Sequence, residues 1–378
     1  MVRFPSWGCI SMSVISTKML QAGGGGPARY IFAMAQQKMS VIDASDVTSP
    51  TILATISNSL FNQNNYMAID YARSIIWEVS AGGNSLRGRD ISDLTSISAS
   101  PDVTVANGNK DTYGLAIYGD YMYVTTIDGV QVWDISNGTS TTTSHKDVQL
   151  TYSYSWHQAP TMTTGATYNN SDGSNQTYLY VSNKYTGNST YLSSYNNTSP
   201  SSTSFKSKRS NYYEGGDASQ QHFLGWAKDA KIIASATYAR DSLSWYDASN
   251  PLSIPSASKI MGNSSLNKVI DPQMTSDGSY TFCVSDKSNN PTFLSISTAG
   301  VLTGTTPSIA ATVLPDANGN LESCMLNSSE EYVCISDRGL ARVYIYDVTN
   351  PASPSLAGSV SDGTNLGTTR FCIWYEPT

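Results

Sequence analysis

The sequence predicts an all-β fold, a single seven-bladed β-propeller of four-stranded antiparallel blades that is closed by its C-terminal strand. Three observations lead to this prediction. The chain repeats with a period of about 50 residues, short runs of β-branched and aromatic residues are cut by Gly/Asp pairs, and only 13% of the residues are charged. Low charge together with 10% aromatic residues indicates an ordered β protein rather than a disordered chain.

The clearest copy of the repeat is Tyr113–Asn137, YGLAIYGDYMYVTTIDGVQVWDISN. It divides into three apolar runs that meet at Gly119-Asp120 and at Asp128-Gly129. Gly and Asp tolerate the left-handed backbone of tight hairpin turns. The three runs therefore predict consecutive antiparallel strands.

The third strand of each unit is predicted to end at an Asp that is followed, two residues later, by Ser or Thr. These side chains accept nearby backbone N–H groups and so set a tight turn out of the strand. The Asp copies of the pattern are Asp43, Asp90, Asp134, Asp247 and Asp347, and Ser193 and Ser295 replace Asp in two degenerate copies. Three copies continue to a proline, which suits a position where the sheet ladder has stopped.

The second unit illustrates the expected blade of four strands. Its apolar runs predict strands at Tyr66–Tyr71, Ser74–Ser80, Ser85–Ile91 and Thr95–Ser98. Four short strands in each unit match the blade of a propeller, which is a small radial sheet.

These units resemble LVIVD-type propeller repeats. The resemblance is strongest at Tyr121–Ser136 and at Tyr332–Pro354, which reads YVCISDRGLARVYIYDVTNPASP. The resemblance implies the propeller fold for most of the chain. The family is typified by bacterial and archaeal surface or secreted proteins, and it brings no catalytic motif to carry over.

A propeller must join its first blade to its last or leave sheet edges exposed. In the second unit the run YMAIDY precedes the strand-like run ARSIIWEV. Ala28–Met34, ARYIFAM, resembles ARSIIWEV, and Phe371–Glu376, FCIWYE, resembles YMAIDY. We therefore expect the C-terminal run to be the innermost strand of the first blade. The alternative assigns closure to Cys9–Ile15. With closure by the C-terminal run, residues 27–378 form the propeller, and residues 1–26 form either an extra edge strand or an N-terminal arm to a neighbouring subunit.

Charge and hydropathy exclude two classes of partner. The net charge of −7 disfavours nucleic acid, which proteins bind by neutralising phosphates with Lys and Arg. No apolar run is long enough for a membrane-spanning helix, and no cleaved signal peptide is recognisable. The cysteines lack metal-ligand spacing, and Cys283 and Cys334 are expected to be buried thiols.

Two segments depart most from the repeat, residues 138–176 and 199–221, and both are rich in Ser, Thr, Asn, Tyr and Gly. Long loops on a rigid scaffold often carry binding sites, although these segments also suit solvated connections between blades. The candidate binding residues are Trp156 and His157 in the first segment and Tyr212 and Tyr213 in the second.

One segment has the outline of a calcium loop, with oxygen-bearing side chains at Asp316, Asn318, Asn320 and Glu322. The pair Asn318-Gly319 is also a strong hairpin-turn signal, and the glycine is misplaced for an EF-hand. The sequence favours the turn, so no cofactor or metal is expected. The histidines His145, His157 and His222 lack metal-ligand spacing. No catalytic residue is assigned either, because the sequence contains no nucleophile-elbow motif.

The sequence favours a non-enzymatic structural or interaction protein, a propeller subunit of a larger homo- or hetero-oligomeric assembly. Such an assembly would be a virion or phage appendage, or an extracellular surface fibre or layer. The alternative is a carbohydrate-binding or adhesin module that uses residues 138–176 and 199–221 to bind glycan. A third interpretation is a hydrolase or lyase at the channel mouth. The fold itself does not decide between these classes, because propellers host all of them.

Overall fold

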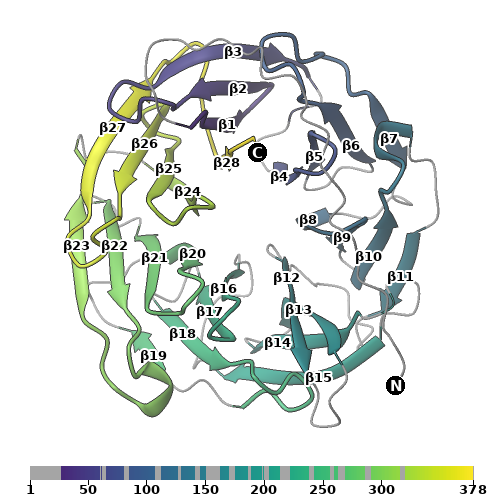
Figure 1. The fold of residues 1–378 in the computed structure, drawn as a ribbon, viewed down its shortest axis with the longest axis vertical. Coiled ribbons are helices and arrows are strands. Elements are labelled where there is room, and N and C mark those ends of the chain that lie inside the picture. The colour runs from purple at the N-terminus through teal and green to yellow at the C-terminus, as the bar shows by residue number, and fades with distance from the viewer. Residues whose placement is uncertain are drawn as a thin grey trace, which may run out of the picture.

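The computed structural model describes residues 27–59, 61, 65–80, 85–106, 112–126, 129–140, 145–149, 162–169, 175–185, 189–197, 199, 204–212, 222–237, 242–255, 259–262, 269–285, 291–315 and 320–377. Over these residues the strands pair into seven four-stranded antiparallel sheets, which stand around a central axis as a closed ring (Figure 1). The all-β propeller prediction is confirmed. No helix in the described part of the chain is long and apolar enough to cross a membrane.

We number the sheets as blades 1 to 7 and give the strands of each from the axis outward. Blade 1 consists of β28 (Phe371–Tyr375), β1 (Tyr30–Ala35), β2 (Lys38–Asp43) and β3 (Thr51–Ser57). Blade 2 consists of β4 (Asn65–Asp70), β5 (Ile75–Ser80), β6 (Ser85–Asp90) and β7 (Val103–Ala106). Blade 3 consists of β8 (Thr112–Tyr118), β9 (Tyr121–Thr126), β10 (Gly129–Asp134) and β11 (His145–Gln149).

The remaining blades follow the same order. Blade 4 consists of β12 (Met162–Asn169), β13 (Asn175–Tyr185), β14 (Ser189–Asn196) and β15 (Ser204–Tyr212). Blade 5 consists of β16 (His222–Ala227), β17 (Ile232–Thr237), β18 (Ser242–Asp247) and β19 (Lys259–Gly262). Blade 6 consists of β20 (Val269–Met274), β21 (Tyr280–Ser285), β22 (Thr292–Ser297) and β23 (Ile309–Val313), and blade 7 of β24 (Leu321–Leu326), β25 (Tyr332–Asp337), β26 (Arg342–Asp347) and β27 (Ser355–Ser361). Two short 3-10 helices are described, η1 (Gly138–Ser140) and η3 (Val301–Thr303).

The predicted Asp turns are confirmed at all five Asp positions. In each case the carboxylate Oδ1 accepts the backbone N–H of the residue two positions later, at 2.8 or 2.9 Å. The two degenerate assignments are wrong. Ser193 and Ser295 lie inside strands and are buried, while β14 ends at Asn196 and β22 ends at Ser297. Without an Asp as a marker, the sequence did not define where these two strands stop.

The fourth strand predicted for the second unit, Thr95–Ser98, is also wrong, and the outer strand of blade 2 is Val103–Ala106. Asp93 Oδ1 accepts the Thr95 N–H at 3.0 Å, and this local bond holds the segment in a turn. A side chain that bonds its own neighbouring backbone competes with the sheet ladder, which explains the shift.

The C-terminal run closes the ring, as predicted. Strand β28 pairs antiparallel with β1, with Tyr375 opposite Tyr30 and Phe371 opposite Met34, and it takes the innermost place in blade 1. The alternative closure by Cys9–Ile15 is therefore wrong. Residues 1–26 lie outside the described residues, so the arm remains a prediction.

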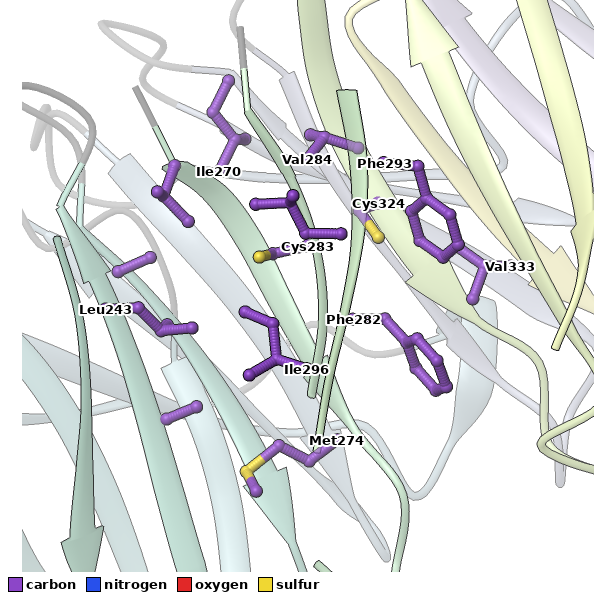
Figure 2. Close-up of a cluster of buried hydrophobic side chains, with 14 of the residues drawn as sticks. Leu243, Ile270, Met274, Phe282, Cys283, Val284, Phe293, Ile296, Cys324 and Val333 are labelled. Carbon is purple, nitrogen blue, oxygen red and sulfur yellow. The ribbon is translucent and has the colours of Figure 1, made fainter. Parts of the chain in front are cut away.

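Packing between adjacent blades forms the core. The largest cluster extends over blades 5, 6 and 7 and includes Cys283, Phe282 and Phe293 (Figure 2). Strand β1 is apolar on both faces because Phe32 and Met34 pack in the cluster shared with blade 2 and Ile31 and Ala33 pack in the cluster shared with blade 7. The outer strand β23 instead alternates between exposed and partly buried residues. The expected burial of Cys283 and Cys334 is confirmed.

Candidate functional site

The innermost strand of blade 6, β20, is interrupted at Asp271. The register of β20 against β21 shifts between Ile270 and Gln273, which marks a β-bulge. Asp271 has φ of 49°, in the left-handed region that residues other than glycine rarely adopt. Pro272 follows and cannot donate to the sheet ladder, so the bulge suits the sequence at this point.

Residues of the two neighbouring blades, 5 and 7, contact the bulge. A Cβ atom built on Gly225 of β16 would lie 2.4 Å from the carbonyl oxygen of Pro272, so the bulge touches blade 5 at a position where only glycine fits. On the other side, the backbone N–H of Cys324 in β24 donates to Asp271 Oδ2 at 3.2 Å. The side chain of Gln273 also donates to Asp271 Oδ1 at 3.2 Å.

Asp271 is 4% exposed, and within the described part of the chain no ion pair reaches its carboxylate. Burial raises the pKa of Asp271 to about 7, although the hydrogen bonds from Cys324 and Gln273 act to lower the pKa. A carboxyl group with a pKa of about 7 is present in both protonation states at neutral pH. It can therefore take up or release a proton there, as a general base or acid must.

Strained backbone and displaced pKa values both concentrate at functional sites. The same features would also suit a purely structural bridge between blades 6 and 7. Asp271 is the candidate site because it combines both features on an innermost strand. Sequence analysis did not single out this residue. The available signal was the Asp-Pro pair within the strand-like run VIDPQM, where proline is unexpected.

Most of the site residues predicted from sequence fall outside the part of the chain that the structure describes, so the binding-loop and calcium sites stay predictions. Trp156, His157, Tyr213, Asp316 and Asn318 lie outside the described residues. Tyr212 is the last residue of β15 and pairs with Ser189. The other two candidate calcium ligands contact Arg338: its N–H donates to the Asn320 carbonyl at 2.8 Å, and its Nη1 lies 3.4 Å from Glu322 Oε1. Across the described ranges, no group of three or more His, Cys, Asp or Glu could hold a metal ion.

The ring of radial four-stranded sheets defines the class of protein as a β-propeller. Within this class the chain carries LVIVD repeats. The LVIVD repeat model matches residues 110–145, which span β8 to β10, and residues 322–362, which span blade 7. The resemblance noted from sequence is confirmed for these two regions. No curated protein sequence matches the chain.

Several solved structures share the fold over nearly their whole length. A candidate 6-phosphogluconolactonase from Bacteroides fragilis superposes with a TM-score of 0.67 at 9% identity, covering 92% of this chain and 98% of that one. The periplasmic gluconolactonase of Pseudomonas aeruginosa gives a TM-score of 0.63 at 8% identity, with the same coverage. A functionally unknown protein from Desulfotomaculum acetoxidans gives 0.62 at 12% identity, covering 92% and 99%.

These neighbours contradict the interpretation of the chain as a non-enzymatic assembly subunit, together with its carbohydrate-binding alternative. That interpretation took the propeller without an evident catalytic motif as a sign of a structural protein. The same architecture, over more than nine-tenths of both chains, occurs in proteins named as gluconolactonases. The expected subunit partners and the virion or cell-surface location stay predictions.

Proposed function

We propose that the chain is a hydrolase that opens a small cyclic ester of the sugar-lactone class, with Asp271 as its general base. The observation that carries the proposal is the carboxyl group of Asp271, which is buried on the innermost strand of blade 6 with a pKa of about 7. The gluconolactonase names of the fold neighbours suggest the substrate class. At identities near 10% these neighbours support the fold, and Asp271 supports the chemistry.

The reaction assigns a simple role to each group. The ionised carboxylate of Asp271 accepts a proton as water attacks the lactone carbonyl. The ring C–O bond then breaks, and the departing oxygen takes up a proton, so lactone and water give the open hydroxy acid. Gln273, which donates to Asp271 Oδ1, holds the carboxylate in place and acts as a positioning residue.

The test is acid release from glucono-1,5-lactone, measured by titration at constant pH with spontaneous hydrolysis subtracted. We expect turnover by the full chain and a loss of about 10²- to 10⁴-fold in Asp271→Asn, the range that a general base contributes. The control is Asp46→Asn, because Asp46 is an exposed turn residue of blade 1. It should retain full activity.

The pH dependence of the wild type is a second measurement that requires no variant. The rate should rise as pH increases through about 7, where Asp271 loses its proton. Folded wild-type protein without turnover above the spontaneous rate would refute the proposed activity. Turnover that is unchanged in a folded Asp271→Asn variant would refute the assigned base.

A further inference from the structure

We propose that Cys334 and Cys372 are a disulfide-forming pair that covalently closes the propeller ring. The two residues lie on opposite sides of the seam where the C-terminal strand completes the first blade. Cys334 belongs to β25 of blade 7, and Cys372 belongs to β28, the closing strand of blade 1. This inference is independent of the proposed hydrolase activity.

The two side chains meet between the sheets. Both are completely buried, and both belong to the hydrophobic cluster between blades 7 and 1, which also contains Ile345 and Trp374. The thiols of Cys334 and Cys372 are within hydrogen-bonding contact of each other. Both cysteines are free thiols in this structure. A disulfide between the facing sheets of a β-sandwich has the same arrangement.

The closing strand is also held in register beside Cys334. Ser323 of β24 accepts the backbone N–H of Cys372 at 3.0 Å, and its Oγ lies 3.3 Å from Cys372 Sγ. These contacts fix the Cys372 side chain against blade 7. The pairing partner is thereby selected by the fold rather than by proximity in sequence.

The other buried cysteines belong to a different interface. Cys283 and Cys324 lie in the cluster shared by blades 5, 6 and 7 (Figure 2). Cys324 belongs to β24, next to β25, but the hydrophobic cluster that contains it faces away from the seam. Cys372 makes a hydrogen-bonding contact with Cys334, whereas its interaction with Cys324 is electrostatic without such a contact, so Cys334 is the preferred partner of Cys372.

The oxidant is a low-molecular-weight disulfide such as oxidised glutathione. One cysteine thiolate attacks the glutathione disulfide, which forms a mixed disulfide and releases one glutathione thiolate. The second cysteine thiolate then attacks the protein sulfur of the mixed disulfide, so the Cys334–Cys372 bond forms and the second glutathione leaves. Two protein thiols are oxidised, and one glutathione disulfide is reduced to two thiols.

Burial makes the pair inert while the ring is closed. Burial raises the pKa of Cys334 well above its usual value, and the thiolate is the reactive form. Exchange therefore requires β28 to leave blade 7 for a time. Because β28 is a short strand at the edge of its sheet, where it pairs with β1, it can detach without breaking the other blades. The bond then forms as the strand returns, and it prevents the next opening.

The experiment treats full-length protein with a glutathione redox buffer in urea below the unfolding midpoint, followed by alkylation and peptide mass mapping. We expect a linked peptide that contains Cys334 and Cys372, a higher melting temperature, and reversal of both by dithiothreitol. The matched control is Cys283→Ser, a buried cysteine away from the seam, which should form the same link. Cys372→Ser should not form it.

Mapping of the wild type decides the proposal even if Cys372→Ser fails to fold. A link from Cys372 to Cys324 or Cys283, or glutathione adducts at both cysteines without a link between them, would overturn it. A Cys334–Cys372 link that leaves the melting temperature unchanged would overturn its role in ring closure.

Discussion

Arg29 Nε donates to Glu376 Oε1 at 3.2 Å, although 347 residues separate them in the chain. The same carboxylate accepts the Asn327 side-chain amide at 2.9 Å and the Ser328 backbone N–H at 3.0 Å. Glu376 thus joins the entry to blade 1, the end of the closing strand and the loop between β24 and β25. These polar contacts reinforce the β28–β1 ladder that closes the ring.

Replacing Glu376 with alanine should weaken ring closure. Burial acts to raise the pKa of Glu376, but the hydrogen bonds from Ser328, Asn327 and Arg29 outweigh it and lower the pKa. The charged form is therefore stabilised by folding. We expect Glu376→Ala to lower the free energy of unfolding by about 1–3 kcal/mol, as measured by urea denaturation. Glu331→Gln, at a half-exposed partner of Arg29, is the control and should cost under about 1 kcal/mol.

Asp271 should make stability depend on pH in the direction opposite to most carboxylates. Its pKa in the folded state, about 7, lies above the ordinary value of 3.8, so the folded protein binds the proton more tightly than the unfolded chain. This contribution is fully present below pH 3.8 and is lost as pH rises to about 7. From pH 4 to pH 8, wild type should lose on the order of 4 kcal/mol relative to Asp271→Asn. A constant difference between the two proteins across this range would contradict the shift.

Glu78 in blade 2 should be sensitive to loss of its charge. Its carboxylate is buried and forms ion pairs with two guanidinium groups: Arg89 Nη2 lies 3.3 Å and Arg87 Nη1 lies 3.7 Å from Glu78 Oε1. Glu78→Gln would leave two buried cations without their shared anion. We expect unfolding experiments to show a loss of about 3–5 kcal/mol. Glu322→Gln removes a more exposed ion pair with Arg338 and should cost under about 1 kcal/mol. Similar losses in the two variants would disprove this reading of Glu78.

Gly225→Ala should disturb the bulge at Asp271 from the side of blade 5. The added Cβ would lie 2.4 Å from the Pro272 carbonyl oxygen, and neither backbone can give way freely. We expect thermal or urea unfolding to show a loss of about 1–3 kcal/mol. Gly363→Ala is the matched control, because a Cβ there meets nothing within 4 Å. Equal stability of the two variants would show that the bulge adapts without strain.

The sequence by itself determined the repeated blade, the turns at its Asp positions and the closing strand. These features are local, or they recur between copies. An Asp such as Asp347 bonds the backbone two residues onward, and FCIWYE could be matched to YMAIDY of another unit. Where the repeat lost its Asp, as at Ser193, this local information failed and the strand end was misplaced.

Only the tertiary structure decided the pKa of Asp271 and the contact between the two cysteines of the seam. The pKa of Asp271 depends on its burial and on a backbone N–H from blade 7. The contact between Cys334 and Cys372 exists only because the last strand returns to the first blade. Burial, solvation and charge at these positions are set by residues from neighbouring blades. No local pattern in the sequence encodes such distances, so these properties appear only when the ring is closed.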